Sequence, residues 1–165
     1  MAKGKGLVVL ALLIGISGLG LGLYSLLFPQ VQTGGIQKTW FIYDSWPHFT
    51  QPIYTDIPID DLTINFTVKS GESVYFLFKT HASVISGSLS SVVINFVLDG
   101  ILVSSPEYPD GIFSSNNVKA SGSIILQMAT DTISPGLHNI TISIRGNIIN
   151  NAIDESTLLV QTYIP

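Results

Sequence analysis

The side chains that most often carry out acid–base catalysis or bind metals are few and widely spaced in this sequence. Its three histidines, His48, His81 and His138, lie far apart, and none has a metal-ligating partner two or four residues further on. The chain has no cysteine, which excludes disulfides, thiolate metal sites and cysteine nucleophiles. No segment matches the motifs of serine hydrolases, zinc proteases or phosphate-binding glycine loops. We therefore predict a protein that is not an enzyme and has no cofactor.

Acidic residues offer the one candidate for metal binding. Asp56, Asp60 and Asp61 lie within a short segment, and Glu107 with Asp110 forms a second group. Calcium needs six to eight oxygen ligands, and neither group follows the spacing of an EF-hand loop. Two interpretations remain open for Asp56, Asp60 and Asp61: a calcium site in a loop, or solvated carboxylates at turns.

Aromatic residues are concentrated in one stretch of the chain, which includes both tryptophans. Such amphipathic rings stack on sugars and contribute to protein or lipid contacts, but they also fill cores. The alternatives are a binding surface or a first strand that plugs the core under a loop of packed aromatics. Phe41 lies within the stretch, and the candidate binding residues are Trp40, Tyr43, Trp46, Phe49 and Tyr54.

Two tripeptides match the acceptor motif for N-linked glycosylation. They begin at Asn65 and Asn139, each followed two positions later by a threonine. Both asparagines alternate with apolar residues, so both side chains are expected to point outward from their strands. Asn65 and Asn139 are therefore candidate glycosylation sites, and the alternative is a chance match in threonine-rich strands.

The elements that position these residues are predicted to be β-strands. In residues 62–68 every second residue is apolar and the residues between are Thr or Asn, which is typical of a half-buried strand. Asp99-Gly100 is a hairpin signal, and residues 87–91 and 114–123 are expected to be loops. The predicted strands cover residues 38–43, 53–57, 62–68, 74–78, 92–98, 101–103, 124–128, 140–144 and 158–164.

These short strands with turns between them predict an all-β antiparallel sandwich, either jelly-roll-like or immunoglobulin-like. The Cys–Trp–Cys pattern of immunoglobulin domains is absent, which favours the jelly-roll-like order. The sandwich is expected to span residues 37–165, after a short stem at residues 29–36.

The N-terminal part of the chain is predicted to cross a membrane. Residues 7–28 contain no charged side chain, and at about 1.5 Å per residue a helix of that length spans a hydrocarbon core of roughly 30 Å. Lys3 and Lys5 precede this segment and the next basic residue is Lys38, so residues 1–6 are expected to be cytoplasmic and the sandwich extracellular. A retained signal-anchor is the prediction; a cleaved signal peptide and a prepilin-type leader are the alternatives.

Small residues form a stripe within this segment. Ala11, Gly15, Gly18 and Gly22 are spaced three or four apart, and Gly18 and Gly22 form a GxxxG motif that allows close approach of helices in lipid. The alternatives are self-association through this helix face, or the ordinary glycine content of membrane helices.

Charge excludes one class of partner. Of 165 residues, 11% are charged and 46% are hydrophobic, and the formal net charge is −4. Nucleic-acid binding requires a basic surface, so no nucleic acid is expected. The expected partners are the lipid bilayer, a second copy through the membrane helix, and an unknown extracellular protein or glycan.

Several segments give the sequence a familiar look: a Lys/Gly start, a glycine-rich apolar helix, Ser70–Phe76, Leu98–Gly100, Ser134–Thr141 and the terminal LVQTYIP. Together they resemble small single-pass, membrane-anchored β-sandwich surface proteins of archaea, including Asgard archaea. The resemblance implies a cell-surface location and no catalytic residue or cofactor. A weaker resemblance is to archaeal surface-filament subunits, although Ala11 stands where many type IV pilins have an acidic residue.

Three functions follow as expectations. The first is a membrane-anchored surface sandwich for recognition, adhesion or envelope structure. The second is a filament subunit assembled through the apolar N-terminal helix or through exchange of strands. The third is a carbohydrate-binding or calcium-dependent module that serves an enzyme partner.

Overall fold

The computed structural model describes residues 34–51, 55–85, 87, 89–103 and 108–165, which form ten strands in one compact unit, Gly34–Pro165. In chain order these are β1 (Gly35–Asp44), β2 (His48–Phe49), β3 (Ile57–Val68), β4 (Ser73–Val84), β5 (Ser90–Leu98), β6 (Ile101–Val103), β7 (Gly111–Ser115), β8 (Ala120–Thr130), β9 (Gly136–Gly146) and β10 (Ala152–Ile164).

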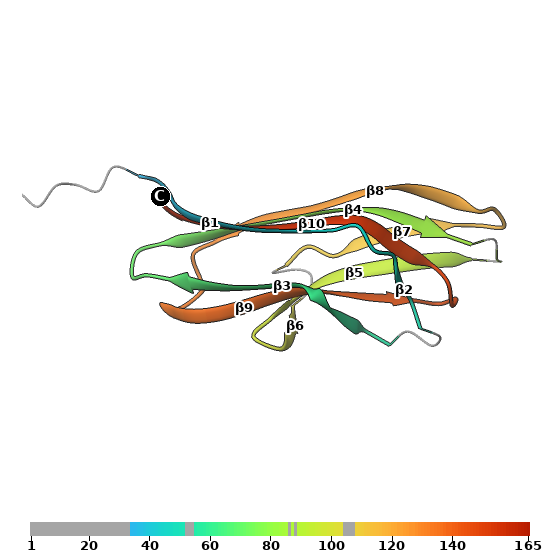
Figure 1. Ribbon diagram of the computed structural model, residues 1–165, viewed down its shortest axis with the longest axis horizontal. Coiled ribbons are helices and arrows are strands. Elements are labelled where there is room, and N and C mark those ends of the chain that lie inside the picture. Colours follow the sequence, from blue (N-terminus) through green and yellow to red (C-terminus); the bar gives the residue numbers. More distant parts are fainter. Residues whose placement is uncertain (1–33, 52–54, 86, 88, 104–107) are drawn as a thin grey trace, which may run out of the picture. The chain divides into compact units, whose positions relative to one another are not determined.

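The strands form two antiparallel sheets that face each other. Sheet A has the order β1-β10-β4-β8, with β2 also paired to β10, and sheet B has the order β3-β9-β5-β6, with β7 also paired to β5. Figure 1 shows the two layers, with β1, β10, β4 and β8 in one and β3, β9, β5 and β6 in the other. The predicted antiparallel sandwich is confirmed.

The pairing is nested along the chain. β1 pairs with β10, β3 with β9, β4 with β8, and β5 with β7. This is the pattern of one long hairpin rolled up into two sheets, which is the jelly-roll arrangement. Of the two orders that the sequence left open, the structure therefore has the jelly-roll order.

The core lies between the sheets and contains the inward residues of every long strand. Phe66, Phe76 and Phe96 are fully buried, and their rings follow one another at 5.7 and 5.9 Å between centroids. Trp40 extends this row from β1, with its ring edge-on to Phe66 at 6.0 Å. A continuous core of this kind needs no disulfide.

The predicted loop at residues 114–123 is confirmed only for residues 116–119, because β7 ends at Ser115 and β8 begins at Ala120. The serines and the glycine at the two ends of this segment indicated a loop, yet they lie in strands. Gly122 packs against the Phe113 ring, which would have to shift to admit a Cβ at this position, 2.9 Å from a ring carbon. Residues 53 and 54 of the predicted strand at 53–57 lie outside the described residues; residues 55 and 56 are not in a strand, and β3 begins at Ile57.

The predicted membrane helix at residues 7–28, with Ala11, Gly15, Gly18 and Gly22, lies outside the described residues. Among the residues that are described, no helix is long and apolar enough to span a bilayer.

Two irregularities shape one end of the sandwich. In β3, residues 60–63 lie opposite the single residue Thr141 of β9, and the Thr141 hydroxyl donates to the carbonyl of Ile59 at 2.9 Å. In β10, residues 155–156 lie opposite the single residue Thr80 of β4. Pairing of β1 with β10 ends at this second bulge, and pairing of β2 begins just beyond it. The chain therefore turns a corner between β1 and β2.

Candidate binding surface at the β1 and β2 edge of sheet A

Successive side chains of β1 point to opposite faces of sheet A, so its aromatic residues are divided between the core and the surface. Trp40 packs against the core, and the Lys38 ammonium lies 4.7 Å from the centroid of its ring. Phe41 and Tyr43 point outward and remain 59% and 57% exposed. The core interpretation therefore holds for Trp40, whereas Tyr43 is open to solvent.

The turn after β1 is held by one buried carboxylate. Asp44 accepts a hydrogen bond from the backbone N–H of Trp46 at 2.9 Å, and the His48 ring donates to its other oxygen at 2.6 Å. The Trp46 N–H lowers the pKa of Asp44, and His48 lowers it further, against the opposing effect of burial. The turn is thereby fixed while the Trp46 side chain stays 75% exposed.

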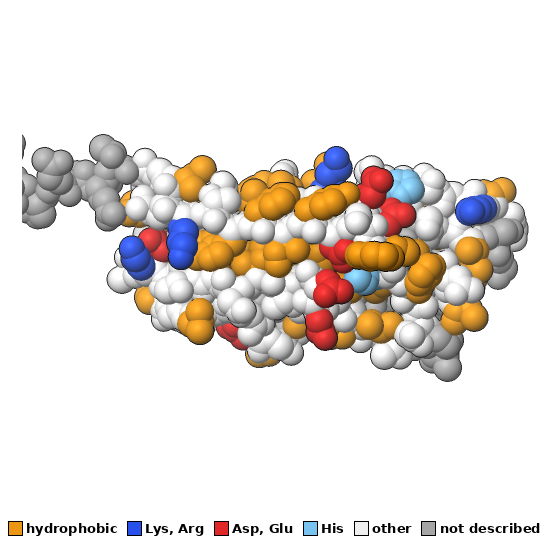
Figure 2. Space-filling model, in the orientation of Figure 1, with side chains coloured by type: hydrophobic (Ala, Val, Ile, Leu, Met, Phe, Trp, Pro, Cys, Tyr) orange, Lys and Arg blue, Asp and Glu red, His pale blue; other side chains and the backbone are white. Residues whose placement is uncertain are grey.

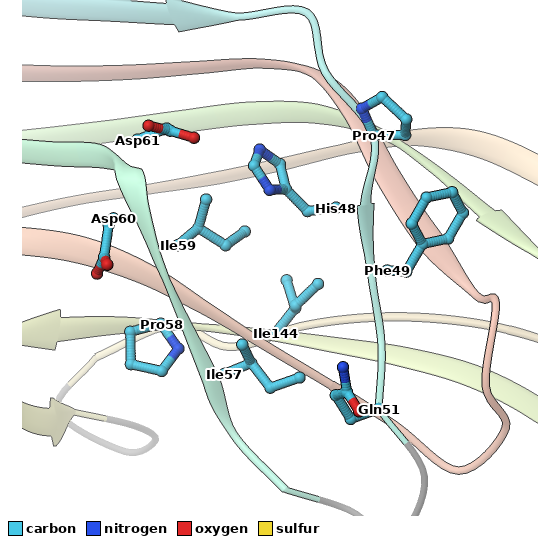
Figure 3. Close-up of a pocket in the computed structure, with 10 residues that line it drawn as sticks. All are labelled: Pro47, His48, Phe49, Gln51, Ile57, Pro58, Ile59, Asp60, Asp61 and Ile144. Carbon is cyan, nitrogen blue, oxygen red and sulfur yellow. The ribbon is translucent and has the colours of Figure 1, made fainter.

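Strand β2 repeats the alternation on a smaller scale. Figure 3 shows the His48 ring on the side of β2 that faces β3, and the Phe49 ring on the opposite side. Phe49 pairs with Ala152 of β10 and is 53% exposed, so it joins the outer side of sheet A. We call Phe41, Tyr43, Trp46 and Phe49 together the aromatic surface.

The outer face of sheet A continues from these rings across β10 and β4. Phe41 pairs with Leu159 of β10, which pairs with Leu77 of β4, and all three alternate with core residues. In the neighbouring row, Thr39 accepts a hydrogen bond from the Gln161 amide at 3.2 Å. Figure 2 shows hydrophobic side chains gathered along β1 on the face that it displays. The cross-strand neighbours of Phe41 in its own row are thus apolar, and those in the row of Thr39 are uncharged.

A cavity of about 420 Å³ lies beside this surface, between β2 and β3. His48 lies on its β2 side, and Ile59 and Ile144 supply apolar walls. Asp60 and Asp61 lie at its edge, and Figure 3 shows Asp60 on the side of β3 away from Ile59. The irregular pairing of β3 places these two carboxylates here.

The structure does not assemble the predicted calcium ligands. Asp56 lies 3.7 Å from the Arg145 guanidinium, and the Asn95 amide donates to it at 3.5 Å, whereas Asp60 and Asp61 border the cavity. Among the described residues, no three His, Asp or Glu side chains lie close enough to hold a metal ion. Of the two interpretations, solvated carboxylates fit Asp60 and Asp61.

Each histidine pairs with an aspartate. His48 contacts Asp44, His81 contacts Asp154 at 3.0 Å, and His138 contacts Asp99 at 2.7 Å. The two members of each pair come from different elements, with Asp99 in the turn between β5 and β6, so each pair ties two segments of the sandwich together. The second partner of His138 is the carbonyl of Ser134. The three pairs thus act as structural links between segments.

The remaining predicted site residues lie on sheet B or outside the described residues. Tyr54 lies outside the described residues. Asn65 and Asn139 are on the outer face of sheet B and are register partners. Phe41 was not among the predicted binding residues, although its alternation with Trp40 and its parity with Tyr43 could have identified it.

No protein-family profile matches this sequence, and no curated protein sequence matches it either. Solved structures with a similar fold were found. The infectious bursal disease virus Gx strain structure has a TM-score of 0.49 at 10% identity, covering 79% of this chain and 33% of that one. The VP2 subviral particle of infectious bursal disease virus gives 0.48 at 13% identity with the same coverage. A family 35 carbohydrate binding module from Clostridium thermocellum gives 0.30 at 15%, covering 78% and 97%. The chain thus spans about a third of the length of the first two.

Proposed function

We propose that this chain is a membrane-anchored surface protein whose sandwich binds a neutral glycan through the aromatic surface, without catalysis. One observation carries the proposal: Phe41, Tyr43, Trp46 and Phe49 are all more than half exposed although the core beneath them is complete. Exposed large apolar side chains that adjoin one another mark interaction sites on soluble domains. Neighbouring rings on one edge are therefore better explained by a ligand than by folding.

The chemistry around the rings supports a neutral ligand. Aromatic faces stack on the apolar faces of sugar rings, while hydroxyl and amide groups hydrogen-bond to sugar hydroxyls. Thr39, Gln161 and Gln127 supply such groups on the outer face of sheet A. Across the sheet Phe41 is followed by Leu159 and Leu77, and the only charged residue in the next row, Tyr43–Thr157–Lys79, lies two strands away from Tyr43. Tyrosine and tryptophan also supply contact area at low cost in side-chain entropy.

The scaffold holds this surface rigidly. Phe41 and Tyr43 are on a strand that is hydrogen-bonded to β10, and Trp46 is on a turn that Asp44 ties at two points. A site that is ordered before the ligand arrives loses less entropy on binding. The aromatic surface therefore has the order that a recognition site needs.

The membrane anchor is part of the same proposal and is supported by the sequence. Residues 7–28 are free of charge and follow Lys3 and Lys5, a pattern that supports a membrane span with the sandwich outside the cell. We expect the native chain to retain its first residues and to stay with membranes after high-salt washing. A chain that starts at Leu7 and sediments as a detergent-resistant polymer would instead favour a filament subunit.

One observation favours that second candidate. Within the described part of the chain, β1, β3 and β8 are edge strands of their sheets. An unpaired edge can accept a strand from another copy. A filament would bury the aromatic surface between subunits, whereas a binding protein would leave it accessible.

Binding can be tested with the full chain in detergent, on a glycan array and by co-sedimentation with insoluble polysaccharides. Trp46→Ala and Tyr43→Ala should each lower the affinity at least tenfold, equivalent to about 1.4 kcal/mol. Ile112→Ala is the matched control, because Ile112 is 63% exposed on β7 of the other sheet. Equal affinity in all three variants, or no glycan bound by the unmodified chain, would overturn the proposal.

A further inference from the structure

The two glycosylation motifs, far apart in the sequence, meet on the outer face of sheet B. Asn65 of β3 is the direct register partner of Asn139 of β9. Neighbouring strands are about 5 Å apart, and paired side chains leave the sheet at that spacing. An N-linked glycan is bulky. Two glycans leaving these two points would occupy the same space.

The two asparagines differ in their accessibility. Asn65 is exposed and lies on β3, the edge strand of sheet B. Asn139 is half-buried and lies on β9, which is paired on one side with β3 and on the other with β5. The backbone N–H of Asn139 also donates to Asp99 at 2.9 Å. A transferase that must grip the acceptor segment can therefore reach Asn65 and not Asn139.

The threonines of the two motifs differ in the same direction. Thr67, which completes the motif of Asn65, is exposed. Thr141, which completes the motif of Asn139, is buried, and its hydroxyl donates to the carbonyl of Ile59 in the irregular part of β3. The hydroxyl that defines the second motif is thus already engaged within the fold.

We propose that the exported chain carries a single N-linked glycan, on Asn65, and that Asn139 stays unmodified. The inference rests on the export that the proposed function includes. The Asn65 amide nitrogen bonds to C1 of the first sugar of a lipid-phosphate-linked oligosaccharide. The C1–O bond to phosphate breaks, the lipid phosphate leaves with the electron pair, and an amide proton passes to a base of the host transferase.

A glycan at Asn65 would lie on the opposite sheet from the aromatic surface. It covers the outer face of sheet B beside β3 and obstructs that edge against pairing with another chain. The aromatic surface is on the outer face of sheet A, which Asn65 does not share. Glycosylation and ligand binding therefore do not compete.

The test uses the full chain purified from the membranes of a host that glycosylates exported proteins. Intact mass and peptide mapping should show one glycan per chain, on Asn65. Asn65→Gln and Thr67→Val should remove it completely, whereas Thr67→Ser, which keeps the hydroxyl, and Asn139→Gln should retain it. A second glycan, a glycan on Asn139 in any variant, or an exported chain without a glycan would overturn the inference.

Export is scored separately, by protease digestion of intact cells. An exported chain that is glycosylated on Asn65 but binds no glycan ligand contradicts the proposed binding activity alone. An exported chain that binds ligand but has no glycan contradicts the inference alone. A chain that is not exported contradicts both.

Discussion

Individual side chains in this protein act mainly as links between distant segments. His138 is the clearest case, because both of its ring nitrogens face acceptors, the Asp99 carboxylate at 2.7 Å and the Ser134 carbonyl at 2.8 Å. Only the doubly protonated ring donates to both. Burial opposes this charge, but the hydrogen bonds to Asp99 and Ser134 outweigh it and raise the pKa of His138.

This pairing predicts a pH-dependent stability. A raised pKa in the folded state gives a contribution that is complete below the ordinary histidine value of 6.5 and is lost as the pH rises through the folded pKa. His138→Gln should therefore lower the free energy of unfolding by about 2 kcal/mol near pH 5 and by much less near pH 9. Urea denaturation of both chains across this range measures the difference.

Asp99 provides the control for this prediction. Burial raises its pKa, but His138 and the backbone N–H of Asn139 outweigh burial and hold the pKa below its usual value. Its own contribution is thus present above that usual value and is lost in acid. When Asp99→Asn is already present, adding His138→Gln should cost less unfolding free energy at low pH than it does in the wild-type chain. If His138→Gln alone lowered the unfolding free energy by the same amount at every pH, the assignment would be contradicted.

At the scale of elements, connections at one end of the sandwich converge on Asn151, which is fully buried. Its side-chain oxygen accepts from the backbone N–H of Ile85 and the hydroxyl of Ser90, and its amide donates to the carbonyl of Ser91. Its backbone carbonyl also accepts from the N–H of Thr50. One residue therefore joins the segment after β4, the start of β5 and the segment after β2.

Replacing Asn151 should lower the free energy of unfolding substantially. Asn151→Ala leaves the N–H of Ile85 and the hydroxyl of Ser90 without their acceptor, and we expect a loss of about 3 kcal/mol in the free energy of unfolding. Asn116→Ala is the matched control, because Asn116 is exposed in the turn between β7 and β8. Thermal or urea unfolding of the two variants compares them, and similar losses in both would show that Asn151 has no special role.

The elements also show what the sequence could and could not predict. Alternation in residues 62–68 predicted the strand and its buried face, because burial has a period of two on a half-buried sheet. The pairing of Asn65 with Asn139 was not predictable, since it depends on the extra residues in β3. The corner after β1 was missed for a similar reason: it depends on a bulge in β10, more than a hundred residues further along.

The whole molecule adds one property of its own. Gly34–Pro165 forms one compact unit and has a hydrophobic core of its own. Nested pairing means that the first and last long strands are neighbours, so the end of the chain is held by β1 and β4. Each sheet therefore depends on strands from both halves of the sequence, and the unit should unfold in one step.

This predicts that residues 34–165 fold alone. The isolated fragment should unfold in a single transition, within about 2 °C of the same transition in the detergent-solubilised full chain. Calorimetry of both proteins makes the comparison. A markedly lower midpoint, or two transitions in the fragment, would show that the preceding residues contribute to the core.

The position of the aromatic surface relative to β1 has a mechanical consequence. The strand runs from Gly35, next to the end nearest the proposed anchor, to Asp44, next to Trp46. If a ligand pulls on Trp46 while Gly34 is held, the force acts on the two ends of β1, and the extended backbone of this strand carries the tension. The hydrogen bonds to β10 are perpendicular to this pull and need not break. A load on the aromatic surface would therefore reach Gly34 without passing through the core.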